Sequence, residues 1–311
     1  MFVQDVPLLD FRSIELGSVL GKGATSTAFR STFNGKSYAA KVLKTEDDFG
    51  RPMPSGTDET LQAELLALSK LGAHPNVVQF YGVCSDSESN PMIVLELVEG
   101  KDLERYLSQL KPGFDLGRAT IQKWSLDLMS ALDFLHNRDP MIVHCDVKPA
   151  NLLVTPCRTS LKLTDFGIAK LLDRERRLSR PLKANEGSPR YRAPEVLSST
   201  GVASFTEKAD IYSAGMVVHY LLTGRRPESD TAADPRSRPS LAVARLRWRG
   251  AADVVERMWA HDAERRPTAG ECAAVIRSLG RADEEEEEEP AVPRGCYAGI
   301  RWPSARQRLV A

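Results

Sequence analysis

The sequence has 311 residues, 42% hydrophobic and 27% charged, which is enough to bury a large core in one domain or two lobes. Lys plus Arg and Asp plus Glu both number 42, so net charge favours neither nucleic acid nor an anionic membrane as the main partner. Apolar runs are too short to span a bilayer. The N-terminus also lacks the basic region with which an export signal begins. We therefore expect a soluble, cytoplasmic protein without a membrane segment.

The cysteines support the same compartment. They are odd in number, widely spaced and without a C-x-x-C pair, so we expect reduced thiols and neither a disulfide nor a zinc site. The five are Cys84, Cys145, Cys157, Cys272 and Cys296.

Short β-rich segments separated by Gly, Asn and Ser turns dominate residues 13–97. Strands are predicted at 14–21, 27–33, 36–43, 76–83 and 91–97. One amphipathic helix interrupts them at 57–72, with Leu61, Leu65 and Leu68 on one face.

After residue 97 the pattern becomes mainly helical. Helices are predicted at 102–110, 116–137, 206–223, 251–260 and 268–279, and short strands near 151–154 and 161–164. This indicates an α+β protein with a small sheet lobe at 13–97 and a larger helical lobe at 98–280. Residues 281–311 are acidic and then rich in Pro and Arg, which predicts a disordered tail.

A glycine-rich hairpin is predicted at "LGKGATSTAF". It does not match the Walker A motif, because Gly17 lies one residue too close to Gly-Lys and Gly23 follows Lys22. Gly21, Gly23 and the small Ser26 instead make a nearly bare turn, whose backbone N–H groups can approach phosphates. An ordinary turn remains an alternative.

Lys41 and Glu64 are predicted to form an ion pair. Alternation in "SYAAKVL" directs Lys41 towards a covered face, and Glu64 borders the apolar stripe of the 57–72 helix. Burying a lone charge costs several kcal/mol. Each residue therefore supplies the opposite charge that the other needs at a covered position. The alternative is that Lys41 extends to solvent and Glu64 pairs with solvent or Lys70.

Two further motifs bring polar side chains together. "HCDVKPAN" places Asp146, Lys148 and Asn151 on one short loop, and "TDFG" places Asp165 directly after a strand. Asp165 and Asn151 offer hard oxygen ligands of the kind that suit Mg²⁺ held between protein and phosphates.

Taken in order, these motifs resemble those of eukaryotic-type protein kinases over about residues 13–280. The matches are "GKGATSTAF", "AAK", "AELLAL", "LELVEGKDL", "HCDVKPAN", "DFG", "GSPRYRAPE", "ADIYSAG" and "RRP". The resemblance implies a two-lobed kinase fold with one regulatory helix in the small lobe. It implies ATP and Mg²⁺ as cofactors and a protein with an acceptor hydroxyl as substrate, with no role for nucleic acid.

The resemblance also implies roles for the polar residues. Lys41, held by Glu64, would bind the α- and β-phosphates, and Asn151 and Asp165 would hold Mg²⁺. Asp146 would accept the proton of the attacking hydroxyl.

An adenine site follows from the same resemblance. Ala28 and Ala39 would cover one side of the base and Leu153 the other, with backbone hydrogen bonds to Glu96 and Val98. Leu95 would be the gatekeeper and Asp102 a ribose contact. An alternative is that Ala28, Ala39 and Leu153 are ordinary residues of the hydrophobic core.

Substrate class and two structural contacts complete the resemblance. Lys148, two residues after Asp146, is typical of Ser/Thr kinases, and Ser188 would hydrogen-bond to Asp146 and Lys148. Glu195 would pair with Arg266, and Asp210 would hold the backbone of the catalytic loop. The segment around Arg266 resembles the tyrosine-kinase-like group of Ser/Thr kinases.

Cys145 departs from the usual kinase pattern, which has an arginine before the catalytic aspartate. That arginine would bind a phosphate on the activation loop. Its absence resembles the non-RD kinases, so we expect activity that does not require activation-loop phosphorylation, although "RRLSR" around Ser179 looks like a phosphorylation site. A reactive, regulatory Cys145 is a second alternative.

Two other functions stay open. A pseudokinase scaffold would keep the fold without catalysis, and the chain could be a catalytic fragment of a larger receptor-like kinase. The acidic tail could contact the basic segment 173–183 in an autoinhibitory way. The protein substrate and the oligomeric state are not predicted.

Overall fold

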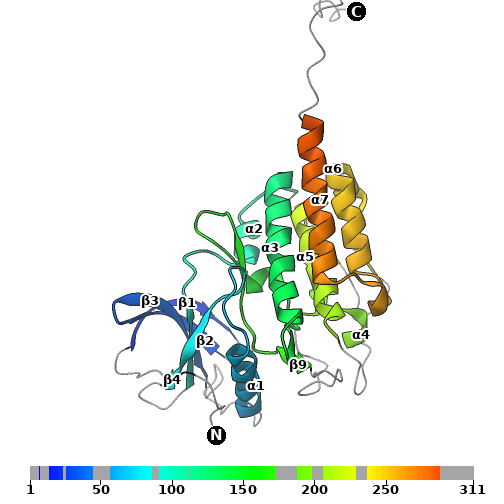
Figure 1. Ribbon diagram of the computed structural model, residues 1–311. Helices are drawn as coiled ribbons and strands as arrows, with labels where there is room; N and C mark the ends of the chain where they lie inside the picture. Colours follow the sequence, from blue (N-terminus) through cyan, green and yellow to red (C-terminus); the bar gives the residue numbers. More distant parts are fainter. Residues whose placement is uncertain are drawn as a thin grey trace, which may run out of the picture.

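In the computed structural model the chain folds into two lobes (Figure 1). A five-stranded antiparallel sheet and one helix form the N-terminal lobe, and helices dominate the C-terminal lobe, as the two-lobed α+β prediction requires. The structure describes residues 7, 14–23, 26–44, 57–85, 91–111, 113–172, 188–197, 206–228 and 237–287.

The N-terminal sheet has the strand order β1-β2-β3-β5-β4, so β3 lies at its centre. Its elements are β1 (Ile14–Lys22), β2 (Ser26–Phe33), β3 (Lys36–Leu43), α1 (Thr57–Ser69), β4 (Phe80–Ser85) and β5 (Pro91–Glu96). Helix α1 lies between this sheet and the C-terminal lobe, where it contacts β9 (Lys170–Leu172) (Figure 1).

The C-terminal lobe is built around α5 (Lys208–Thr223), which is buried along its whole length. Helix α3 (Arg118–His136) packs on α5 and α7, and α6 packs on α5 and α7. A helix buried on all sides needs an apolar surface all round, and "IYSAGMVVHYLL" supplies it. The other helices are α2 (Leu103–Ser108), α4 (Pro194–Leu197), α6 (Ala242–Met258) and α7 (Ala269–Glu287).

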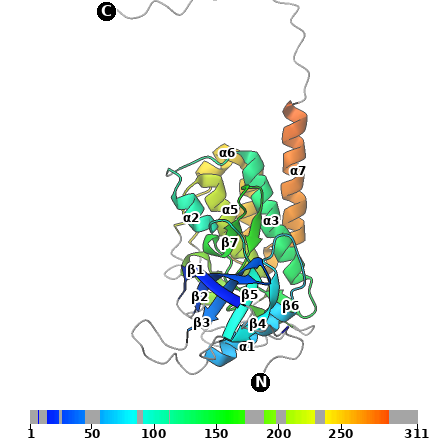
Figure 2. The same cartoon turned by 90° about the vertical axis from the view of Figure 1, so that its left-hand side faces the viewer.

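Short strands and turns join the lobes and carry the polar motifs. Figure 2 shows the sheet lobe against one end of the helical lobe, with some of these short segments labelled. They are β6 (Met141–Val143), η2 (Pro149–Asn151), β7 (Leu152–Val154), β8 (Leu161–Leu163), η3 (Pro189–Tyr191) and η4 (Ala263–Arg265).

Some predicted boundaries differ from the structure. Strand β4 starts at Phe80 rather than residue 76, because Val77 instead bridges to Leu163 of the C-terminal lobe. Helix α6 starts at Ala242 rather than residue 251, since a short helical segment precedes a break at Trp248, where φ is −157° and ψ is 90°. The three-residue strands β6 and β9 were not predicted.

The C-terminal helix is longer than predicted. Helix α7 continues to Glu287, through residues 281–287 where we expected a disordered tail to begin. Glutamate and alanine are good helix formers, so the acidic run extends the helix that precedes it. The rest of the predicted tail, 288–311, and the basic segment 173–183 lie outside the described residues.

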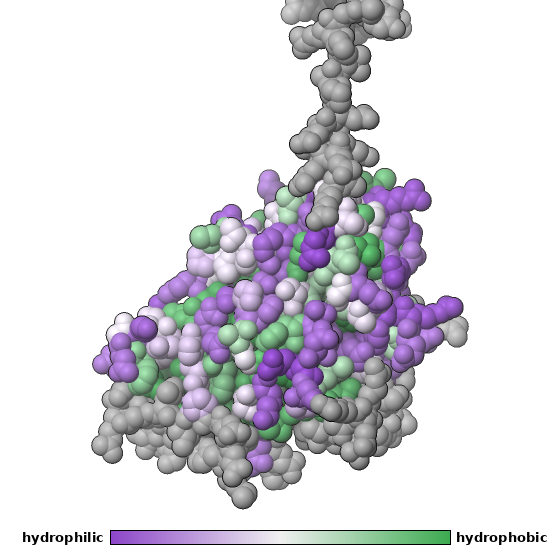
Figure 3. Space-filling model, viewed as in Figure 1, coloured by the Kyte–Doolittle hydropathy of each residue, from purple (hydrophilic) through white to green (hydrophobic). Residues whose placement is uncertain are grey.

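The described surface and the described cysteines are consistent with the composition. On the face in Figure 3, hydrophilic residues dominate the helical lobe and hydrophobic residues appear in small groups. Within the described ranges, no helix combines the length and apolarity needed to cross a membrane. Four cysteines are described and none forms a disulfide, while Cys296 lies outside these ranges.

The predicted pair of Glu195 and Arg266 joins α4 to the segment between α6 and α7. Arg266 Nη1 and Nη2 donate to Glu195 Oε1 and Oε2 at 2.6 and 2.8 Å. Arg266 is only 1% exposed, and it also donates to the carbonyl oxygens of Ala260 and Lys208. Arg245 makes a comparable bond to Glu256 at the surface of α6.

We expect Arg266→Ala to lower the free energy of unfolding by roughly 3 kcal/mol, because it leaves buried acceptors and a carboxylate without their partner. Arg245→Ala serves as the matched control and should have little effect, since its ion pair is exposed to solvent. Urea unfolding of both variants measures the difference. Equal losses would contradict the buried role of Arg266.

Candidate active site

The register of the sheet places the predicted adenine residues on one face. Ala28 of β2 lies opposite Lys41 of β3, and Ala39 of β3 lies opposite Leu95 of β5. Directly opposed residues point to the same side of a sheet, as do residues two apart. Ala28, Ala39, Lys41 and Leu95 therefore share a face, and all four are half-buried, whereas Ala40 on the other face is fully buried.

The C-terminal lobe contributes Leu153 and Asp102. Leu153 of β7 is half-buried, and its backbone forms an isolated bridge with Asp102, which is the N-cap of α2. The Asp102 carboxylate accepts a hydrogen bond from Arg105 N at 2.8 Å. Gly21 pairs with Ala28 and the Gly23 N–H donates to Ser26 O at 2.8 Å, while residues 24 and 25 at the hairpin tip are outside the described ranges.

Lys41 contacts two carboxylates at once. Its Nζ lies 2.6 Å from Glu64 Oε1 and 2.9 Å from Asp165 Oδ1. The predicted pair with Glu64 is therefore present, and the same ammonium also reaches the Asp of "DFG". Glu64 is only 4% exposed, whereas the side chain of Asp165 keeps 47% of its surface. The contact brings one side chain from β3, one from α1 and one from the C-terminal lobe to a single point.

The three groups shift one another's ionisation. Burial lowers the pKa of Lys41, but the nearby carboxylates of Glu64 and Asp165 outweigh it, so its pKa is raised. Burial raises the pKa of Asp165, yet the Lys41 ammonium prevails and that pKa is lowered. The pKa of Glu64 is raised by burial, with Lys41 opposing the shift. Lys41 therefore stays charged and Asp165 stays ionised across the physiological range.

Asp146 is held from three sides. Lys148 Nζ lies 2.5 Å from its Oδ2, and Asn151 Nδ2 donates to the same oxygen at 3.0 Å and to Asp146 O at 2.9 Å. The backbone N–H of Ser188 donates to Oδ1 at 3.1 Å. Ser188 was predicted to bind Asp146 and Lys148. The contact with Asp146 is made by its main chain, which any residue other than proline could provide.

Asp210 holds the backbone of the catalytic loop, as predicted. Its Oδ2 accepts from His144 N and its Oδ1 accepts from Cys145 N, both at 2.8 Å. His136 Nε2 also lies 2.9 Å from Oδ2, a contact that the sequence did not indicate. The carboxylate is 1% exposed, so it holds Cys145 in its left-handed conformation, φ 69°, from inside the lobe.

Asn151 and Asp165 suit a Mg²⁺ ion by their chemistry. The Thr164 N–H donates to Asn151 O at 3.0 Å, so the two residues lie on adjacent backbone segments. Because Asn151 Nδ2 is directed at Asp146, the carboxamide oxygen is the atom left for a cation. One carboxylate and one amide oxygen match an ion that keeps water and phosphate as its other ligands. In the described residues, no site gathers three or more His, Cys, Asp or Glu side chains.

Side-chain hydrogen bonds of Glu96 hold the end of β5, where the next segment begins. The Glu96 carboxylate accepts from Lys162 Nζ at 2.9 Å and from Gln79 N at 3.2 Å. Its side chain is thus engaged, and its backbone N–H donates to Gln79 O at 2.8 Å, so the carbonyl oxygen is the group that the predicted adenine contact would use. Within the described residues, nothing accepts a hydrogen bond from Val98 N–H, which leaves this donor for a ligand.

Gly100 sets how closely this segment approaches the C-terminal lobe. A Cβ at Gly100 would lie 1.7 Å from Val154 O, so only glycine fits here. The neighbouring Val154 N–H donates to Lys101 O at 2.8 Å.

Sequence reasoning missed one ion pair at this site. Arg30 of β2 forms two bonds with the Glu99 carboxylate, at 2.7 and 2.5 Å. Arg30 lies two residues from Ala28, so it is on the same face of the sheet. The pair joins β2 to the segment after β5. Alternation along "AFR" places Arg30 on the same face as Ala28. Nothing in the sequence indicated that Glu99 is its partner.

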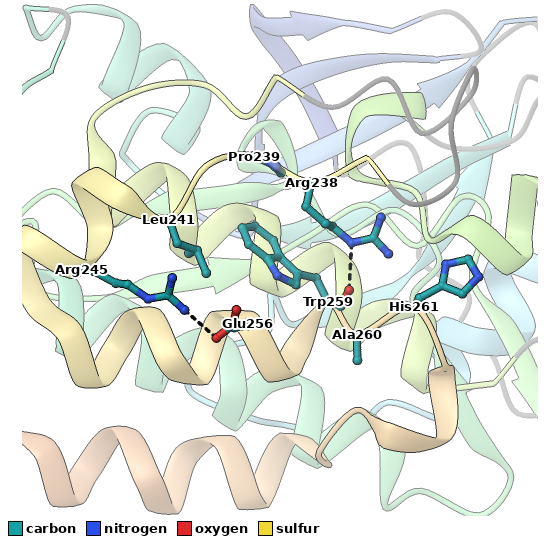
Figure 4. Close-up of a pocket in the computed structure, with 8 residues that line it drawn as sticks. All are labelled: Arg238, Pro239, Leu241, Arg245, Glu256, Trp259, Ala260 and His261. Atoms are coloured by element: carbon teal, nitrogen blue, oxygen red, sulfur yellow. Dashed lines mark hydrogen bonds and ion pairs between the residues drawn. The ribbon is translucent and has the colours of Figure 1, made fainter.

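A separate cavity of about 540 Å³ lies in the C-terminal lobe (Figure 4). It is lined by Arg238, Pro239, Leu241, Arg245, Glu256, Trp259, Ala260 and His261. Arg238 Nε donates to Trp259 O, and Arg245 pairs with Glu256, so its two arginines are already engaged. It shares no residue with the candidate active site.

The sequence of this chain is similar to those of known protein kinases. The family described as "Protein kinase domain" matches residues 14–275, and the chain belongs to this family. Serine/threonine-protein kinase STY46 of Arabidopsis thaliana is 28% identical over 95% of this chain and 49% of its own length. Human mitogen-activated protein kinase kinase kinase 7 is 28% identical over 88% of this chain and 43% of its own.

A third relative, CBL-interacting serine/threonine-protein kinase 15 of Arabidopsis thaliana, is 35% identical over 70% of this chain and 48% of its own length. The chain therefore spans about half the length of the curated relatives it matches. All three are protein kinases by name, and two are named as serine/threonine kinases.

We expect Lys41→Met to destabilise the fold by roughly 3 kcal/mol at neutral pH, because it leaves the Glu64 carboxylate buried without its partner. Removing the ammonium raises the pKa of Glu64 further above its unfolded value. A carboxyl group with a raised folded-state pKa favours folding only at low pH, so the loss should shrink as pH falls towards about 4.3.

Thermal unfolding of the two proteins at about pH 5 and at pH 7.5 tests this. Glu64→Gln is the matched control, since a neutral amide removes the buried charge while Lys41 keeps Asp165. A Lys41→Met deficit that is the same at both pH values would show that Glu64 is not the cause.

Proposed function

We propose that this chain is a Ser/Thr protein kinase that transfers the γ-phosphoryl group of ATP, with Mg²⁺, to hydroxyls of protein substrates. The observation that carries the proposal is the simultaneous contact of Lys41 with Glu64 and Asp165, beside a separately held Asp146. ATP bound with Mg²⁺ would supply the transferable phosphoryl group and the charge that neutralises its oxygens.

The chain's own residues divide the work by position. Lys41, fixed by Asp165, would hold the phosphates through its ammonium, and Asp165 and Asn151 would hold the metal through their oxygens. Asp146 orients the acceptor hydroxyl and accepts its proton, and Lys148, 2.5 Å away, adds positive charge beside the transferred group. Little covalent chemistry remains for the protein, so positioning and charge carry the rate.

Lys148 also supports Ser/Thr specificity. It contacts the carboxylate of Asp146, where its charge lies beside the acceptor. The kinases named above are consistent with this class. The proposed setting is cytoplasmic, and a larger protein that contains this domain remains compatible with the length of the relatives.

The pseudokinase alternative predicts a defective site. Instead, Lys41, Asp146, Asn151 and Asp165 are all present and arranged around connected segments. That arrangement favours catalysis over a scaffold.

We expect Asp146→Asn to lower kcat by roughly two orders of magnitude or more, as loss of a transition-state contact costs about 3 kcal/mol. Nucleotide binding should persist, because Lys41 and Asp165 are unchanged. Phosphoryl transfer from labelled ATP and Mg²⁺ to a Ser/Thr-rich acceptor measures kcat, and calorimetric titration with ATP and Mg²⁺ measures binding. Equal and low transfer by both proteins, with nucleotide bound, would favour the pseudokinase.

Cys145 supports a proposal on regulation. Its thiol donates to Val143 O at 3.2 Å, and position 145 thus carries no guanidinium that could bind a phosphate on the activation segment. We infer that activity does not require such a phosphate. The segment around Ser179 lies outside the described residues.

Phosphatase treatment should therefore leave the activity of the native protein nearly unchanged. Cys145→Arg introduces a cation next to Asp146, and this variant should lose activity on phosphatase treatment because its guanidinium then has no anion. Activity is measured before and after treatment for both proteins. Loss of native activity, with the same response in Cys145→Arg, would refute the inference.

A further inference from the structure

An exposed arginine lies two residues from a direct contact with the catalytic carboxylate. The Ser188 N–H donates to Asp146 Oδ1 at 3.1 Å, and turn η3, which contains Arg190, follows at once. Tyr191 is buried and its carbonyl accepts from Ser213 Oγ of α5 at 2.7 Å. The turn is thus anchored on one side of Arg190 by the core and on the other by Asp146, while Arg190 is exposed.

The guanidinium of Arg190 is fixed without being neutralised. Its Nη1 donates to Pro227 O at 2.6 Å, and a carbonyl oxygen carries no formal charge. A guanidinium has five N–H donors, so most of them remain for another acceptor. In the described part of the chain, no carboxylate lies within ion-pair distance of Arg190.

The segment that accepts the hydrogen bond from Arg190 carries two further arginines. Arg225 is exposed and has no ion pair with a described residue, and Arg226 pairs with Glu104 of α2. Helix α2 packs in turn on η2, the turn that ends at Asn151. The segment at 225–228 therefore carries two arginines and one glutamate, Glu228, and of the two arginines Arg226 is already paired with Glu104.

We propose that Arg190, with Arg225, selects acceptor peptides that carry Asp or Glu next to the phosphorylated Ser or Thr. This inference rests on the proposed kinase function and specifies its substrate class. A planar guanidinium can bind a carboxylate through two parallel hydrogen bonds, and its anchoring on Pro227 reduces the conformational entropy lost on binding. Lysine or arginine flanks in the peptide would instead be repelled.

Three peptide mixtures test the proposal. Each has a central Ser and randomised outer positions, with the flanking residues fixed as Glu, Ala or Lys. For the native chain, kcat/KM should fall in the order Glu, Ala, Lys, by roughly three- to tenfold between Glu and Ala. The difference should appear mainly in KM and shrink at high ionic strength.

Charge reversal gives the sharper readout. Arg190→Glu should invert the order so that Lys flanks are preferred, and Arg225→Glu should shift it the same way if the first variant does not fold. Arg190→Lys should keep part of the preference. Arg277→Ala, which removes an exposed arginine on α7, is the control and should leave the order unchanged.

The outcomes separate the two proposals. Equal kcat/KM for the Glu and Lys mixtures, or an order that neither charge reversal changes, overturns the preference while leaving the kinase function intact. No transfer to any of the mixtures overturns both.

Discussion

The ammonium group of Lys41 links the two lobes. Lys41 extends from the central strand of the sheet and contacts Glu64 of α1 and Asp165 of the C-terminal lobe. Burying Glu64 is affordable only with a cation beside it, and Asp165, half exposed, adds a second attraction that crosses the lobe boundary. Rotation of α1 away from the sheet would separate Glu64 from Lys41 and break this ion pair. The position of α1 and the ionisation of the site are therefore one property of the structure.

A second buried carboxylate does the corresponding work within the C-terminal lobe. Asp210, on the fully buried α5, accepts two backbone N–H groups of the catalytic loop and contacts His136 of α3. Cys145 and Asp165 both have positive φ, an unfavourable conformation for residues other than glycine. Asp210 holds the first of these directly. The loop that presents Asp146 is thus held both by the helix core, through Asp210, and by its own side chains, since Asn151 Nδ2 donates to Asp146 O.

How far sequence predicts this site depends on the kind of contact. Lys41 and Glu64 were predictable as a pair, since alternation in a strand and a helical stripe each placed a charge at a covered position. Helix α5 was predictable because its apolar surface is continuous. The contact of Ser188 with Asp146 was expected from the resemblance, but its donor is the main-chain N–H, and residue type carries no signal for a backbone donor.

Long-range surface pairs were equally hidden. Glu99 and Arg30 are 69 residues apart, and neither has a neighbour in sequence that indicates the other. Boundaries failed where a local propensity met a tertiary contact: Val77 was expected in a strand and instead bridges to the other lobe. The prediction for the acidic run after residue 280 was wrong in the opposite direction. Composition suggested disorder, but the run extends the preceding helix α7 as far as Glu287.

The same division between core and surface separates catalysis from selection. Lys41, Asp146 and Asp165 are positioned by partners that are buried or that belong to the site itself, so changing them alters the chemistry. Arg190 is positioned by the neutral carbonyl of Pro227, so changing its charge breaks no ion pair among the described residues. A fold organised in this way can keep one reaction while the choice of substrate varies. Arginines around Asp146 would then be the first place where this chain differs in function from kinases with the same central residues.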